Sequence, residues 1–503
     1  MTADHKRRLH VGRGCALAAA IGLVLIGGCG LAAHLYDRHW EKKVEAKLAE
    51  YRAAGQPVTW EEVVAARQSV PPEENSALIF LEAFKQMAPF DNMCTEVFAR
   101  DFAIKWTGGA RHSKEVRDLI NARLAANQGA LNIIDGAAEL PSGAYPIDPA
   151  EAPSSVALRH VSPLRWTAKL CALRAAHRAE SGDRPEAVEA LMVSRKVGLS
   201  LAEHPLLIEE LVRIAFESLW LGAMQRSLET CGLASTDVLA LRRDVASAYV
   251  KRTMAAAFSA ETVKILCYTE APETGVAELL DLGVNPPYVY LYVLVPGLRQ
   301  KDALLACRLT DRLSEACALS ARGQWLAANS IGGDCSSLRL GGSLTAVGMS
   351  AWCPALASDV QARTRLRVAD AALAVEQWRL AHGRWPDSLE QLVPELLEEV
   401  PDDPFCNEKI RYRRTEDGVV VYSVGPDGQD NNGEPEEDHW DEAYDIPFRL
   451  LDPELRGGRT LTFREEVMDS ELPLEALEEA GYTVEKLQAL GFSEADIREL
   501  GWR

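Results

Sequence analysis

Residues 358–383 read SDVQARTRLRVADAALAVEQWRLAHG, and residues 410–423 read IRYRRTEDGVVVYS. In the first stretch, apolar residues recur at the three- and four-residue spacing of an amphipathic helix, and a glycine ends it. In the second, two short β-prone runs flank Asp417-Gly418, a pair suited to the positive φ angles of a hairpin turn. This order predicts a small α+β unit over residues 356–450.

The chain before this unit has the pattern of paired helices. Apolar residues follow helical spacing over residues 164–180, 184–203 and 206–231, and turn-forming residues separate the three stretches. The composition, 47% apolar and 25% charged, is ordinary for folded protein, and 503 residues favour more than one domain. We therefore expect a mainly α fold, a helical bundle or helix-hairpin array, over residues 37–355.

The N-terminal segment predicts attachment to a membrane. Residues 14–36 contain no Asp, Glu, Lys or Arg, and about 20 such residues span a bilayer as a helix. Basic residues before this segment favour a cytoplasmic stretch at residues 1–13. We expect a single-pass inner-membrane protein with its body on the periplasmic side. Two alternatives are a lipid on Cys29, preceded by Ile26-Gly27-Gly28, and a buried helix of a soluble protein.

The α+β unit also resembles the globular part of the major pseudopilin of type II secretion (the G class), and modules at the C-terminus of uncharacterised membrane-anchored bacterial proteins. The residues that carry the resemblance are His382, Gly383, Pro386, Ser388, Leu389, Pro401, Asp403, Pro404, Tyr412, Tyr422, Ser423, Gly425, Asp427, Gly428, Asp445 and Ile446. The leader motif of pseudopilins, Gly-Phe-Thr-Leu-x-Glu, does not occur in the chain. We therefore expect the fold of this unit to be pseudopilin-like, but we do not expect the chain to polymerise into a pilus.

The resemblance implies a calcium site in the loop that follows the hairpin. Asp427 and Asp445 fall where the family places acidic ligands, while Asp430 and Asn432 are chosen because they lie close by in the same loop. Calcium takes six to eight oxygen ligands from flexible loops of this kind. The alternative is that these residues only form turns, because Asp and Asn tolerate left-handed backbone.

The last thirty residues, 474–503, divide into three units of ten. Each unit has an aliphatic residue at its fourth position, Gly at its eighth and an aromatic residue at its ninth. Thr483 and Ser493 are expected to cap the short helices that follow them. Such units bury apolar surface by stacking on neighbours, so we expect a scaffold, with partner binding as a further possibility.

Charge and motifs narrow the function. A net charge of −20 disfavours nucleic-acid binding, which needs a concentrated basic face. The chain contains no HExxH or GxSxG motif, and no pattern points to a small-molecule substrate. We expect a non-enzymatic protein that binds protein partners, with a role beside secretion machinery as a variant. The alternative is a hydrolase whose active-site residues meet only in the folded helical body.

The eleven cysteines show no CxxC or zinc-type spacing, so a structural metal site is not expected. In an exported protein, Cys307 could pair with Cys317, or Cys335 with Cys353. The alternative is that they are buried free thiols.

Overall fold

The computed structural model describes residues 28, 30–68, 70–88, 108–137, 140, 143–148, 158–203, 206–250, 254–271, 292, 295–337, 344–434, 445–470, 477–478 and 480–501. The described chain is mainly helical and carries one small antiparallel sheet, which confirms the expected fold class in outline.

A helix without a label covers residues 30–53. The body that follows contains α2 (Trp60–Gln68), η1 (Pro72–Glu74), α3 (Ser76–Phe84), α5 (Lys114–Ala126), α6 (Gln128–Ala137), α7 (Val161–Glu180), α8 (Arg184–Leu199), α9 (Leu207–Thr230), α10 (Ser235–Val250), α11 (Met254–Glu270), α14 (Pro296–Cys317), α15 (Ala321–Ser337) and α16 (Leu344–His382). The C-terminal region contains η3 (Leu389–Leu392), β1 (Arg411–Arg414), β2 (Gly418–Ser423), β3 (Ile446–Leu451), η4 (Pro453–Leu455), α17 (Phe463–Ser470), α19 (Val484–Ala489) and α20 (Glu494–Glu499).

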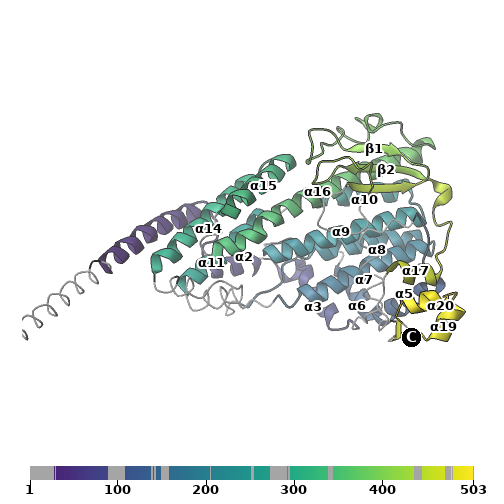
Figure 1. Ribbon diagram of the computed structural model, residues 1–503, viewed down its shortest axis with the longest axis horizontal. Coiled ribbons are helices and arrows are strands. Elements are labelled where there is room, and N and C mark those ends of the chain that lie inside the picture. The colour runs from purple at the N-terminus through teal and green to yellow at the C-terminus, as the bar shows by residue number, and fades with distance from the viewer. Residues whose placement is uncertain are drawn as a thin grey trace, which may run out of the picture.

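The long helix α16 is the spine of the molecule. It packs against α9, α10, α14 and α15, and its C-terminal half lies against β2 and β3 (Figure 1). The helix begins at Leu344, fourteen residues before the start expected from the sequence, and continues through Pro354. Trp352 and Leu356 are buried in the core that α16 shares with α11 and α14, so tertiary packing outweighs the helix-breaking tendency of the proline.

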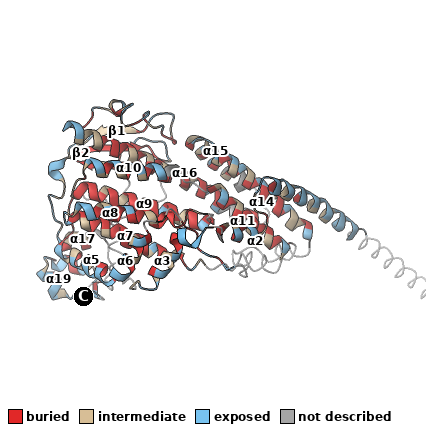
Figure 2. Cartoon of the chain, turned by 180° about the vertical axis from the view of Figure 1, so that it is seen from behind, coloured by how far each residue is buried: buried red, intermediate tan, exposed pale blue. Residues whose placement is uncertain are grey.

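The sheet has the order β1-β2-β3 with both pairs antiparallel. Val421 is opposite Tyr412 in β1 and Phe448 in β3. Every residue of β2 is buried, because α16 covers one face and the loop after β2 reaches the other. Val419 and Val421 join α16 in the largest hydrophobic cluster, which extends from Ala77 to Ile497. The α+β unit and the helical body therefore share one continuous core (Figure 2).

The helix over residues 30–53 extends from one end of the molecule, and the C-terminal helices pack at the other end (Figure 1). Two hydrogen bonds fix this helix along α14: the Tyr51 hydroxyl donates to the carbonyl oxygen of Cys307 (2.8 Å), and the main-chain nitrogen of Gly297 donates to Asp37 (2.5 Å).

The structure corrects the expected membrane anchor. No helix in the described part of the chain is both long and apolar enough to span a bilayer. The apolar residues at the start of the 30–53 helix give way at Asp37 to a charged stretch. Residues 14–27 and Cys29, which carried much of the prediction, lie outside the described residues. The described residues therefore contradict the predictions of a single-pass anchor, of the membrane as a partner, and of an inner-membrane location with a periplasmic body.

At the C-terminus, the caps expected at Thr483 and Ser493 are present, since their side chains accept from the main-chain nitrogens of Lys486 and Asp496. Among the described residues, Cys307 and Cys317 are free thiols, so the Cys307–Cys317 pairing is wrong.

Candidate functional site

The loop expected to bind calcium folds around Asp445, which directly precedes β3. The Asp445 carboxylate accepts hydrogen bonds from the main-chain nitrogens of Asn431 (3.1 Å) and Gly433 (2.6 Å). Burial raises the pKa of Asp445, and the nearby charges of Asp430 and Asp427 raise it further. The two main-chain hydrogen bonds lower this pKa, but they do not offset the increase. The three predicted carboxylates therefore lie within electrostatic reach of one another.

The other predicted ligands shape the same loop. Asp427 accepts from the main-chain nitrogen of Gln429 (3.0 Å), and Asp430 accepts from that of Asn432 (2.9 Å). Asn432 has a φ of 62°, a left-handed conformation that asparagine tolerates. No group of three or more His, Cys, Asp or Glu side chains in the described residues is arranged to hold a metal ion. In this arrangement the four residues act as turn formers.

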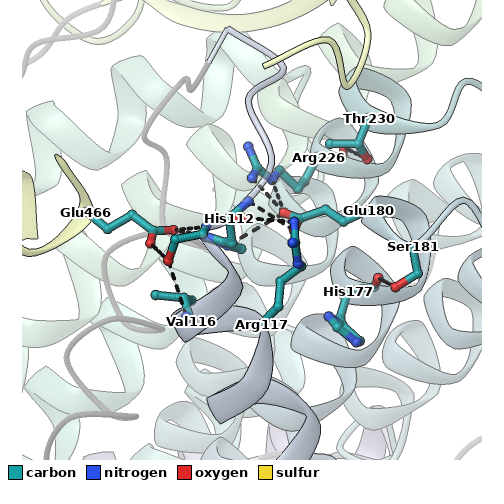
Figure 3. A network of polar contacts seen from close by, with 10 residues as sticks. His112, Val116, Arg117, His177, Glu180, Ser181, Arg226, Thr230 and Glu466 are labelled. Carbon is teal, nitrogen blue, oxygen red and sulfur yellow. Dashed lines mark hydrogen bonds and ion pairs between the residues drawn. The ribbon is translucent and has the colours of Figure 1, made fainter. Parts of the chain in front are cut away.

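A buried polar network joins the C-terminal segment to the helical body. His112 lies between two carboxylates: its Nδ1 atom is 2.7 Å from Oε1 of Glu466 on α17, and its Nε2 atom is 3.6 Å from Oε1 of Glu180 on α7 (Figure 3). The main-chain nitrogens of His112 and Ser113 donate to Glu180 (3.2 Å) and Glu466 (3.1 Å). Each carboxylate thus contacts both the ring and the adjacent backbone.

Further charges surround this network. Arg226 on α9 donates to Oε1 of Glu180 (2.6 Å), and Arg117 donates to the carbonyl oxygen of His112 (2.9 Å) (Figure 3). Burial opposes ionisation of Glu180, but the charges of His112 and Arg226 outweigh it and lower the pKa of Glu180. On the same helix, burial lowers the pKa of His177, and the charge of His112 lowers it further.

Local sequence explains how these groups meet. Ser113 is the N-cap of α5, and its side chain accepts from the main-chain nitrogen of Val116, so His112 is held one residue before the helix. The residue before His112, Arg111, donates its main-chain hydrogen to the carbonyl oxygen of Arg459 and accepts from the main-chain nitrogen of Leu461, both at 2.8 Å. These two bonds bring the start of α17 next to this loop.

The network does not have the connections of a hydrolytic triad, although it contains Ser, His and Glu. The Ser113 hydroxyl donates to Glu466 rather than to His112. A nucleophilic serine needs a base within hydrogen-bond reach of its hydroxyl. His112, Ser113 and Glu180 are also buried. The arrangement is suited to holding segments together.

A second buried network links α2, α7 and α9. Arg67 forms two hydrogen bonds with the carboxylate of Glu209 (2.7 and 2.8 Å), and His160 contacts the same carboxylate (2.8 Å). The ring of His160 stacks on Tyr145 at a centroid distance of 4.1 Å. Burial opposes the ionisation of Glu209, but Arg67 and His160 lower its pKa to about 2. With its ring stacked and hydrogen-bonded inside the fold, His160 has the contacts of a structural histidine.

The described surface has one further feature of interest, a shallow cleft between α14 and α15. Its volume is about 300 Å³, and its lining residues are Arg312, Glu315, Ala316, Leu319, Ala327, Ser330 and Ile331. Leu319, which lines the cleft, is 50% exposed. Leu326 on α15 is next in sequence to the lining residue Ala327 and is 53% exposed. Leu319 therefore presents a half-exposed apolar side chain at the cleft.

Sequence reasoning did not single out His112, Glu180 or Glu466. A lone histidine before a capped helix and a glutamate within a helix are common, and no local spacing connects position 112 with position 466. The serine cap at Ser113 was the available local signal, and it locates a helix start only.

Comparisons with known protein families, curated proteins and solved structures gave no match to this chain.

Proposed function

We propose that the chain is a non-enzymatic protein-interaction scaffold, in which a helical body carries a pseudopilin-like α+β unit. The observation that carries the proposal is that buried and half-buried charged side chains bridge elements distant in sequence. The pairs are Arg67–Glu209, Arg226–Glu180, Arg242–Asp370 and Arg456–Glu376. Such pairs fix the relative positions of helices, which is what a rigid binding scaffold needs.

The pseudopilin-like element of the proposal is supported by the order of helix and strands. A long helix, α16, is followed by η3 and then by the antiparallel strands β1, β2 and β3. Other helices of the body cover the remaining faces of α16. This burial is a reason to propose a fixed component of a scaffold rather than a polymerising subunit. A role beside secretion machinery stays within this proposal as a variant.

We also propose that the loop around Asp445 binds calcium. Asp427, Asp430 and Asp445 supply hard oxygen atoms within one short region, and their mutual repulsion is relieved when a divalent cation binds. The ion would require the loop to close further, since the carboxylates now accept main-chain hydrogen bonds.

The surface that suits a protein partner is the α14–α15 cleft. Ala316, Ala327 and Ile331 give it an apolar floor, and Arg312 and Glu315 supply charges at its edge. Leu319 exposes half of its surface at the cleft, and Leu326, next in sequence to the lining residue Ala327, is also exposed. An apolar segment of a partner protein with a few polar groups fits this chemistry.

The test compares co-purifying proteins of wild type and two variants by quantitative mass spectrometry. Leu326→Asp places a charge beside the cleft, while Leu239→Asp places one at another partly exposed leucine, on α10. The proposal expects a specific protein to be depleted about tenfold or more with Leu326→Asp and retained with Leu239→Asp. Equal recovery with both variants contradicts it.

A further inference from the structure

The C-terminal segment, residues 457–470, is attached to the loop before α5 by few contacts. The main-chain nitrogen of Arg111 donates to the carbonyl oxygen of Arg459, and that of Leu461 donates to the carbonyl oxygen of Arg111, both at 2.8 Å. Beyond this short bridge, α17 brings Glu466 to His112. Phe463 and Val467 bury their side chains in the main hydrophobic cluster, so this segment is held by apolar packing together with these polar contacts.

The His112 ring is placed so that both of its nitrogen atoms face carboxylate oxygens. Nδ1 faces Glu466 on the C-terminal segment, and Nε2 faces Glu180 on the body, at 2.7 and 3.6 Å. Only the protonated ring carries a hydrogen on both nitrogens. A neutral ring directs a lone pair at one of the two carboxylates, in a site where water is largely excluded.

We infer that protonated His112 is a latch that holds residues 457–470 on the helical body, and that its deprotonation loosens this segment. An ordinary histidine changes charge near pH 6.5, within the physiological range. The attached state binds the proton more tightly than the detached state, because two carboxylates face the ring. Linkage then requires the attachment to weaken as the pH rises.

The charges that face His112 come from four helices. They are Glu180 and His177 on α7, Arg226 on α9, Arg117 on α5 and Glu466 on α17. The arginines keep their charge at all relevant pH values, and burial favours neutral His177. His112 is therefore the remaining ionisable group that lies between the two carboxylates.

Glu229 offers a competing source of pH dependence near the same segment. Its carbonyl oxygen accepts from the main-chain nitrogen of Gly457 (3.1 Å), and burial raises the pKa of its carboxyl to about 7. A matched Glu229→Gln variant separates the two groups, because it removes this titration and leaves the His112 network in place.

The experiment measures hydrogen exchange of the full chain by mass spectrometry at about pH 6 and about pH 8, corrected for intrinsic exchange rates. In wild type, protection of residues 457–470 should be about tenfold lower at the higher pH, while protection of α7 stays constant. Unchanged protection of residues 457–470 would overturn the inference.

Substitutions show which residue causes the pH response of hydrogen exchange in residues 457–470. His112→Gln and Glu466→Gln should both abolish the pH response of residues 457–470, and Glu229→Gln should retain it. If His112→Gln also loses protection throughout α7, the variant has disturbed the body itself. The Glu466→Gln variant then provides the test of the latch, because a glutamine at position 466 can still accept a hydrogen bond from Ser113. A response that survives both latch variants, or that disappears in Glu229→Gln, contradicts the assignment.

Discussion

The Nδ1 atom of His112 lies 2.7 Å from Oε1 of Glu466, although 354 residues separate the two in the chain. Through this contact, the segment after β3 packs against the loop before α5. The core from Ala77 to Ile497 is also continuous. The helical body and the C-terminal elements are therefore joined in a single folded structure.

Removing one partner of the buried Arg67–Glu209 pair should destabilise the fold strongly. Glu209→Gln leaves the Arg67 charge buried without its carboxylate, and we expect a loss of about 3–5 kcal/mol in the free energy of unfolding. Asp118→Asn is the matched control, since Asp118 pairs with Lys114 on the surface, and it should cost about 0.5 kcal/mol or less. Urea denaturation measures both. Similar losses would refute this view of the Arg67–Glu209 pair.

The same carboxylate predicts how acid acts on the protein. The pKa of Glu209 in the fold, about 2, lies below the 4.5 of an ordinary glutamate. Its contribution is therefore complete above about pH 4.5 and is lost as the pH falls toward about 2. Denaturation curves of wild type should shift over this interval, whereas those of Glu209→Gln should lack this component of the shift. If the curves of wild type and of Glu209→Gln shifted equally over this pH interval, the low pKa of Glu209 would not contribute to acid denaturation.

Glu229 predicts the opposite trend at higher pH. Burial raises its pKa from 4.5 to about 7, so its contribution is complete below about pH 4.5 and is lost as the pH rises through about 7. Between about pH 4 and pH 8, Glu229→Gln should gain up to about 3 kcal/mol relative to wild type. Urea denaturation at both pH values tests this. A difference between the two proteins that is independent of pH would show that Glu229 is ionised in the fold.

Calcium should stabilise the fold through the Asp445 loop. A ligand that binds only the folded state at a hundred times its Kd adds about 2.7 kcal/mol. Millimolar calcium should raise the Tm of wild type and of Asp387→Asn, an exposed acid outside the loop, while Asp445→Asn should not respond. Absence of a shift in wild type, compared with a chelator-treated sample, would count against a calcium site.

Gly109 should tolerate an added side chain poorly, because little space surrounds it. Its φ is 75°, and an added Cβ would lie 2.5 Å from Cδ1 of Leu451 and 3.0 Å from the carbonyl oxygen of Glu229. Gly182 has a φ of 78° but open space around it. Gly182→Ala should cost about 1 kcal/mol for backbone strain, and Gly109→Ala about 1–3 kcal/mol more for overpacking. Equal losses in urea denaturation would show that the segment around Leu451 yields freely.

Local patterns predicted the elements that depend on local physics. The helices α7, α8 and α9, the hairpin around Asp417-Gly418, and the caps at Thr483 and Ser493 follow from periodicity, turn chemistry and capping, and the structure contains them. The early start of α16 could not be predicted in this way, because its first turns depend on burial of Trp352 against other helices.

The candidate site was harder to predict than the fold. The pseudopilin resemblance indicates Asp427 and Asp445, and Asp430 is chosen as a neighbour in the same loop; the structure does bring the three carboxylates close together. The contacts of His112 with Glu180 and Glu466 depend on how segments far apart in sequence pack. Hydrophobic periodicity determines which face of a helix is buried, but not which polar side chain meets which across the core.

Site-specific photo-crosslinking tests the scaffold proposal most directly. A photoreactive phenylalanine derivative at position 326 places the probe beside the α14–α15 cleft, and the same residue at position 239 is the control on α10. The proposal predicts a covalent adduct of discrete mass at position 326 and none at position 239. No adduct at position 326, or the same adducts at both positions, would contradict the assignment of this chain as a protein-interaction scaffold.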